Sequence, residues 1–191
     1  MKAGSRLPWF GHAIRVASGN TIAMSDQKQL NGPEAVKQLQ ELVDHQAVCM
    51  MITRPKLSSP HTRPMAVAQV DDDGAFWFIT LLHSDKCVDL KDDAHVHLHF
   101  ANPKAQEYLS IYGTGEVVND PVRVKELWSP IARAWVPDGS DNPDLRLLKV
   151  TPDDGYYWDT KDGTVIAAVK IMVAALGMAT KDGGIEGKIR V

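Results

Sequence analysis

The chain has 191 residues, of which 44% are hydrophobic and 24% charged, and its formal net charge is −3. These proportions are typical of a globular protein and exclude a wholly disordered or fibrous chain. Because there is no basic excess to hold a nucleic-acid backbone, we expect no nucleic-acid partner. The length corresponds to one domain, or to one domain with a tail.

Cysteine content and hydropathy indicate the compartment. Cys49 and Cys87 are the two cysteines of the chain, and two cannot form a dense disulfide framework, which favours a reducing cytoplasm. The longest apolar stretch, residues 165–179, has Lys170 at its centre and falls short of the roughly 20 apolar residues that a membrane helix needs. We therefore expect a cytoplasmic protein with no membrane partner.

Both ends of the chain are expected to lie outside the folded domain. Residues 1–24 contain three basic residues and no acidic residue, but no continuous apolar segment of the secretory type. We interpret residues 1–27 as a disordered extension, with an Arg-bearing transit peptide as the alternative. Three glycines near the other end predict a flexible tail over residues 181–191, which leaves residues 28–180 as the domain.

The first expected elements are a helix and a strand. Pro33 suits the first position of a helix, and apolar residues then follow at helical spacing, which predicts an amphipathic helix over residues 33–45. The short apolar run at residues 47–53, placed before an Arg-Pro pair, predicts a buried strand. Residues 56–62 are rich in Ser and Pro and predict a loop.

A hairpin and a short helix are expected next. Three aspartates and a glycine at residues 71–74 are a strong turn signal, so residues 63–70 and 75–80 are predicted to pair as antiparallel strands. Beyond them, Ser84 is a candidate N-cap for a helix over residues 84–92, with Val88 on its buried side.

The clearest strand is predicted at residues 94–101. Its apolar residues alternate with His95, His97 and His99, so the three histidines share one face. One hypothesis is a metal site on this face. However, the outer two histidines lie about 13 Å apart, because a strand rises about 3.3 Å per residue. One ion cannot bind both, and we favour a polar face that meets solvent or a partner subunit.

The second half of the chain continues the β pattern. A long strand is predicted at residues 107–118, with Gly113 and Gly115 marking a bulge or a close backbone approach. The remaining expected elements are a helix from Asp120-Pro121 to about residue 128, a loop at 135–143, strands at 145–150 and 156–158, and a C-terminal helix at 165–176. At least six strands joined by short turns or single helices predict a mainly β fold, an antiparallel β-barrel with peripheral helices.

One group of polar residues predicts a binding site. Arg63 and Thr80 are each about eight residues from the hairpin turn, so they are expected to be neighbours, and Ser84 and Lys86 lie just beyond. Two cations, two hydroxyls and a helix N-terminus suit one phosphate monoester. The alternative is an ordinary barrel rim with scattered polar groups. Phosphate-binding loops of the Walker and dinucleotide types are absent from the sequence.

The same residues carry a family resemblance. Arg63-Pro64-Met65-Ala66, Phe76-Trp77-Phe78-Ile79-Thr80 and Ser84-Asp85-Lys86 resemble the flavin-binding segments of the pyridoxamine 5′-phosphate oxidase-like superfamily. Later segments extend the resemblance, and all the segments together are most similar to the bacterial general-stress-protein branch of that superfamily. The later segments are Tyr108-Leu109-Ser110-Ile111-Tyr112-Gly113, Trp135-Val136-Pro137-Asp138-Gly139 and Tyr157-Trp158-Asp159.

The resemblance implies a split β-barrel homodimer that binds flavin mononucleotide (FMN) at each of two subunit interfaces. Arg63, Thr80, Ser84 and Lys86 would then hold the phosphate. Pro64, Met65, Phe78, Ile79 and Thr80 would line the edge of the flavin ring. Trp135 and Trp158 would form a second wall, to which the other subunit could contribute, and plain core or dimer packing is the alternative for each.

Two departures from the family bear on function. The oxidases end in an Arg-Leu-His-type segment that grips the substrate, whereas this chain ends at residues 186–191 without it. Asp85 stands where the oxidases have a basic residue, which predicts weaker flavin binding. The resemblance therefore implies a redox-active FMN flavoprotein of the stress-protein type, an oxidoreductase of unknown substrate if it is an enzyme. A non-catalytic flavin-binding or sensing module is the main alternative, and a pyridoxamine 5′-phosphate oxidase the next.

Overall fold

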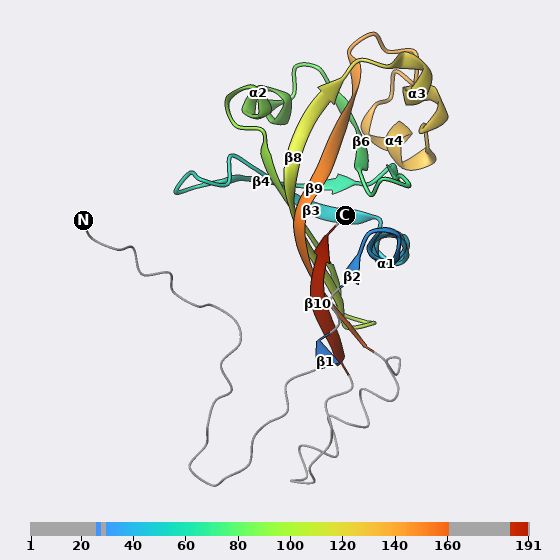
Figure 1. Ribbon diagram of the computed structural model, residues 1–191. Helices are drawn as coiled ribbons and strands as arrows, with labels where there is room; N and C mark the ends of the chain where they lie inside the picture. The colour runs from blue at the N-terminus through green and yellow to red at the C-terminus, as the bar shows by residue number, and fades with distance from the viewer. Residues whose placement is uncertain (1–25, 28–29, 161–183, 191) are drawn as a thin grey trace, which may run out of the picture.

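The computed structural model describes residues 26–27, 30–160 and 184–190, which form a mainly β protein with four helices in the described part (Figure 1). The strands are β1 (Asp26–Gln27), β2 (Leu30–Asn31), β3 (Val48–Thr53), β4 (His61–Ala66), β5 (Gln69–Val70), β6 (Phe76–Leu81), β7 (His95–Asn102), β8 (Glu107–Val118), β9 (Leu145–Thr160) and β10 (Gly184–Arg190). The helices are α1 (Pro33–Asp44), α2 (Asp85–Asp92), α3 (Pro121–Glu126) and α4 (Pro130–Trp135).

The sheet curls into an antiparallel half-barrel, the split β-barrel that the sequence predicts. Its strand order is β4-β3-β7-β8-β9, and the first half of β9 then pairs with β6, which pairs with β5. The second half of β9 pairs with β10 instead, and β10 pairs in parallel with the short strands β1 and β2. Figure 1 shows β8 and β9 running side by side as the long axis of the sheet.

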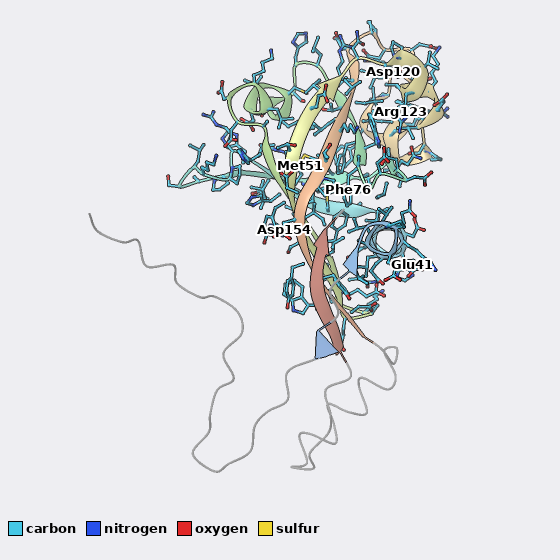
Figure 2. All side chains as sticks on the ribbon, in the orientation of Figure 1. Glu41, Met51, Phe76, Asp120, Arg123 and Asp154 are labelled. Atoms are coloured by element: carbon cyan, nitrogen blue, oxygen red, sulfur yellow. The ribbon has the colours of Figure 1, made fainter. Side chains whose placement is uncertain are left out.

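The main hydrophobic core lies between the curled sheet and α1. Met51, Phe76, Phe78 and Leu98 are fully buried in it, and Figure 2 labels Met51 and Phe76 near the middle of the molecule. Each such side chain contributes about 1.5–3 kcal/mol relative to an exposed one. Leu39 of α1 is also fully buried, so the amphipathic helix predicted at residues 33–45 is confirmed, with Pro33 in its first turn.

A second, smaller core attaches α3 and α4 to the sheet. Trp77 of β6 packs with Val124 of α3, Val136 after α4, and Leu147 of β9. The guanidinium of Arg123 lies 4.0 Å from the centre of the Trp77 ring, a cation–π contact. This core fixes α4 beside β6, and the position matters for the cavity described below.

The predicted hairpin is wrong in its extent. The chain from residue 63 to 70 does not form one strand: β4 pairs with β3 along its whole length, and the two residues of β5 alone pair with β6. The turn itself is as predicted, with Gly74 at φ 78° and the Asp71 carboxylate accepting bonds from the Ala75 amide and the Trp77 indole. The strand predicted at residues 63–70 is divided because its first part, in β4, pairs with the edge of β3 and not with β6.

Helix α2 begins after Ser84 as predicted, but its buried side differs. Val88 is 53% exposed, so the prediction that it faces the protein is wrong, and Cys87 and Asp89 are buried instead. An Asp in the buried position could not be expected from hydrophobic spacing. Its partners, described with the site, come from β3 and β4.

The histidine strand and the glycine pair are confirmed. On β7 the apolar residues Val96, Leu98 and Phe100 are buried and the histidines face outward. The register of β8 against β9 shifts after residue 112, and a Cβ on Gly113 would lie 2.2 Å from the Thr151 carbonyl oxygen. Gly113 therefore marks both a bulge and a close backbone approach.

Other boundaries differ from expectation. Asp120 caps α3 by accepting bonds from the Val122 and Arg123 amides, as the Asp-Pro signal predicts, but α4 begins in a segment where no second helix is expected. The strands predicted at 145–150 and 156–158 are one continuous strand, β9. Residues 26–27 and 184–190 form strands of the sheet where the sequence predicts an extension and a tail.

The helix predicted at residues 165–176, and most of the N-terminal extension, lie outside the described residues. Among the residues that the structure describes, no helix has the length and apolar character to cross a membrane.

Candidate functional site

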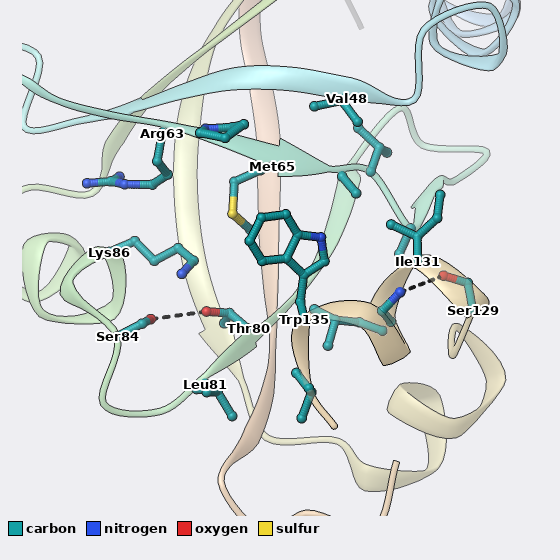
Figure 3. Close-up of a pocket in the computed structure, with 17 residues that line it drawn as sticks. Val48, Arg63, Met65, Thr80, Leu81, Ser84, Lys86, Ser129, Ile131 and Trp135 are labelled. Atoms are coloured by element: carbon teal, nitrogen blue, oxygen red, sulfur yellow. Dashed lines mark hydrogen bonds between the residues drawn. The ribbon is translucent and has the colours of Figure 1, made fainter. Parts of the chain in front are cut away.

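A cavity of about 410 Å³ opens beside β4, β6, α2 and α4 (Figure 3). Its volume falls within the roughly 300–1,000 Å³ of small-molecule sites. The lining residues come from the three strands β3, β4 and β6, the segment after β4, and the helices α2 and α4 with their flanking residues: Val48, Arg63, Pro64, Met65, Ala66, Val67, Ala68, Ile79, Thr80, Leu81, Ser84, Lys86, Ser129, Ile131, Ala132, Trp135 and Val136.

One end of the cavity is polar and cationic. Arg63, Thr80, Ser84 and Lys86 all line it, and the hydroxyls of Thr80 and Ser84 are hydrogen-bonded to each other at 3.0 Å. Figure 3 shows Arg63 and Lys86 on the same side of the cavity, with the Lys86 ammonium turned toward it and the Arg63 guanidinium pointing away from Trp135. Because β4 does not pair with β6, Arg63 and Thr80 are not neighbours in a hairpin. They lie on different strands that both line the cavity.

The pKa of Lys86 is influenced by the neighbouring charge of Arg63. Burial lowers the pKa of its ammonium, and the positive charge of Arg63 lowers it further, against the opposing charges of Cys87 and Asp85. Two like charges at one end of a cavity repel, and an anion placed between them would relieve the repulsion. The first amides of α2 also lack intrahelical acceptors and add to the preference for an anion.

Arg63 is held from behind by a buried network. Its guanidinium donates to the Thr53 hydroxyl at 2.7 Å and to the Asp89 carboxylate at 3.4 Å. Asp89 is 3% exposed and also accepts from Thr53 at 2.5 Å, with the His61 ring nitrogen 2.9 Å away. Burial raises the pKa of the Asp89 carboxyl, but the bonds from Thr53 and His61 and the charges of His61 and Arg63 outweigh it and leave the pKa lowered.

The other end of the cavity is apolar. The Trp135 ring stands across it next to Met65, with Ile131 and Val48 on the side away from the cations (Figure 3). Trp135 is 74% exposed, and the neighbouring lining residues Val48 and Ile131 are about half exposed, so this end of the cavity is an open apolar surface. Trp135 belongs to α4. The Ser129 hydroxyl caps this helix by accepting a hydrogen bond of 3.2 Å from the Ala132 amide.

The cavity collects most of the residues that the sequence singles out. Eight of the ten predicted flavin-binding residues line it: Arg63, Pro64, Met65, Ile79, Thr80, Ser84, Lys86 and Trp135. The other two lie elsewhere in the described structure. Phe78 is fully buried in the main core, and Trp158 packs on Tyr156 of β9 with ring centres 4.4 Å apart.

Sequence reasoning missed part of the apolar lining and the network behind Arg63. Val48, Ile131 and Val136 carry no signal that distinguishes a cavity wall from ordinary packing. The buried carboxylate of Asp89 carried no signal either, because Asp in a predicted helix is mostly exposed.

The histidine face of β7 is separate from the cavity. His95 pairs with Asp93, the His97 ring contacts the Tyr112 ring at 4.7 Å, and His99 bonds the Ser110 hydroxyl at 3.0 Å. Among the described residues, no group of three His, Cys, Asp or Glu side chains is arranged to hold a metal ion.

The protein is a split β-barrel, and its cavity is cationic at one end and apolar and aromatic at the other. These features define a class of small-molecule-binding proteins. The comparison with protein families gives the particular group: residues 34–182 match the family described as pyridoxamine 5′-phosphate oxidase like. The chain belongs to this family.

Individual relatives are consistent with this assignment. The chain is 28% identical over 158 residues to Protein bli-3 of Neurospora crassa, which covers 82% of this chain and 69% of that protein. A solved structure of a putative general stress protein 26 from Jannaschia sp. CCS1 is 27% identical, with a TM-score of 0.63, over 82% of this chain and 95% of that one. The structure of the general stress FMN/FAD binding protein from Xanthomonas citri is 27% identical, with a TM-score of 0.54, and the match covers 65% of this chain and 87% of that one.

Proposed function

We propose that this protein is an FMN-binding flavoprotein of the general-stress-protein type. The observation that carries the proposal is the meeting of Arg63, Thr80, Ser84 and Lys86 at one end of a cavity whose other end is apolar. A phosphate monoester attached to a planar aromatic ring system matches both ends. The Xanthomonas citri relative, described as FMN/FAD binding, supports a flavin as that ligand.

In this proposal the phosphate takes the cationic end and the flavin ring takes the apolar end. Arg63 and Lys86 supply charge, and Thr80 and Ser84 supply hydroxyl donors. Pro64, Met65, Ile79 and Trp135 bound the ring, with Phe78 supporting this wall from the core. When bound, flavin supplies electron or hydride transfer, and the chain supplies binding, orientation and electrostatics.

A non-catalytic flavin-binding module is the second candidate, and one observation favours it. Among the described residues that line the cavity, Arg63 and Lys86 are the ones that ionise, and both are assigned to the phosphate. No lining carboxylate or histidine remains there for proton transfer. A hydride or electron transfer that needs no protein acid would still be possible with these residues.

Absorption spectroscopy tests the proposal. The purified protein is titrated with FMN, riboflavin and flavin adenine dinucleotide, and we expect a red-shifted, structured visible band and the tightest binding for FMN. Absence of binding for all three flavins would refute the proposal. Bleaching of the visible band by a reduced nicotinamide, with turnover, separates the oxidoreductase from the module, and release of pyridoxal phosphate from pyridoxamine phosphate would establish the vitamin B6 oxidase instead.

We further propose a homodimer that forms through the outward face of β3, β7, β8 and β9. Val48, Met50, Tyr108 and Tyr112 are 39–53% exposed on this face, and strand register places the outward histidines among them. Trp158 lies opposite Tyr108 in the same register, so the proposal assigns it to this interface. Light scattering that returns the mass of one chain for the flavin-bound protein would refute it.

A further inference from the structure

We propose that Asp89 is a positioning residue that sets the affinity of the cavity for phosphate by holding the Arg63 guanidinium. The inference rests on the proposed flavin function and adds a residue that does not line the cavity. Asp89 would act entirely through Arg63, from a position three residues after Lys86 on α2.

The geometry of the network supports this role. Arg63 has five N–H groups, and its contacts in the described part of the chain use one on Thr53 and one on Asp89. The remaining N–H groups are left for an anion in the cavity that Arg63 lines. Because the side chain is fixed at two points, little rotamer freedom is left to lose when a ligand binds.

Asp89 also connects the two cations of the site. It lies on α2, the helix that presents Ser84 at its cap and Lys86 in its first turn, whereas Arg63 belongs to β4. The Asp89 bonds to Thr53 and Arg63 join this helix to β3 and β4. They therefore fix the separation between Arg63 and Lys86, which a phosphate must match.

Electrostatics alone predicts the opposite effect of Asp89 on binding. A carboxylate near a phosphate repels it, so replacing Asp89 by a neutral residue would tighten binding if charge were its main contribution. In this structure the charge is already engaged by Thr53, His61 and Arg63. We therefore expect the loss of positioning to outweigh the gain in net positive charge.

The test measures dissociation constants for FMN and riboflavin in five variants of the full chain, one of them a control. Asp89→Asn removes the charge at constant size, and Thr53→Val removes the hydroxyl that bridges Asp89 and Arg63. Arg63→Ala with and without Asp89→Asn completes a double-mutant cycle. Asp92→Asn is the matched control, because Asp92 lies on the same helix with an exposed side chain paired to Arg54.

We expect Asp89→Asn and Thr53→Val to weaken FMN binding about tenfold, within the range measured for residues of one hydrogen-bond network, with riboflavin unchanged. In the Arg63→Ala background, Asp89→Asn should have no further effect, and Asp92→Asn should match the wild type. If Asp89→Asn does not fold, Thr53→Val carries the test.

Three results would overturn the inference. They are an unchanged or tighter FMN affinity, equal losses for FMN and riboflavin, and an Asp89→Asn effect that persists without Arg63. Failure of the flavin proposal itself is a different result, since the wild-type protein would then bind neither flavin.

Discussion

Replacing Lys86 by alanine tests the cationic end of the cavity directly. Hydrogen bonds to charged groups contribute roughly 1.5–3 kcal/mol, which corresponds to about a 10- to 150-fold increase in dissociation constant. Lys86 is partly buried, and burial lowers the pKa of its ammonium, so water screens its attraction to an anion only in part. We therefore expect the loss of FMN affinity to fall in the upper half of that range.

Riboflavin provides the comparison that makes the result specific, because it has the ring system of FMN without the phosphate. Its affinity should change little in Lys86→Ala. Lys91→Ala serves as the control, since Lys91 is an exposed lysine in the last turn of the same helix. Both ligands are titrated against all three proteins, and salt should weaken FMN binding more in the wild type than in Lys86→Ala. Equal losses for FMN and riboflavin would refute the phosphate assignment of Lys86.

Two further predictions concern the fold. Gly113→Ala should lower the free energy of unfolding by about 1–3 kcal/mol in urea titrations, because its Cβ would meet the Thr151 backbone; Thr114→Ala, an exposed neighbour, is the control, and equal stability of the two variants would contradict this. Burial lowers the pKa of both His97 and His99, and for His97 neighbouring histidine charges add to the effect. Their neutral forms therefore favour the fold, so stability should be full above pH 6.5 and fall as the pH drops through the lowered values. Replacing both with Gln should flatten this acid dependence in thermal melts, and an unchanged slope would show that other groups cause it.

Local patterns were sufficient where one element alone decides the outcome. The 3.6-residue spacing after Pro33 defines the buried side of α1, and strict alternation on β7 separates Val96, Leu98 and Phe100 from the histidines. The Asp-Pro start of α3 is a cap made by residues of one segment. These features depend on neighbours in the chain, which the sequence displays directly.

The polar half of the site was also predicted from the sequence, although by incorrect reasoning about its geometry. Arg63, Thr80, Ser84 and Lys86 share the cavity, but β4 pairs with β3 and not with β6. A strand can hydrogen-bond to any exposed sheet edge of matching register, and hydrophobic alternation does not say which edge is nearest in the folded barrel.

What the sequence by itself determined is therefore the class of fold, the faces of α1 and β7 and the residue types that converge on the cationic end of the cavity. The tertiary structure decided the strand partners, the addition of Val48, Ile131 and Val136 to the apolar wall, and the burial of Asp89. Burial of a carboxylate is favourable only when donors meet it, and those donors, on Thr53, His61 and Arg63, lie 26–36 residues away in the chain. That requirement is met by the assembled barrel and by no single segment, so local patterns could not show it.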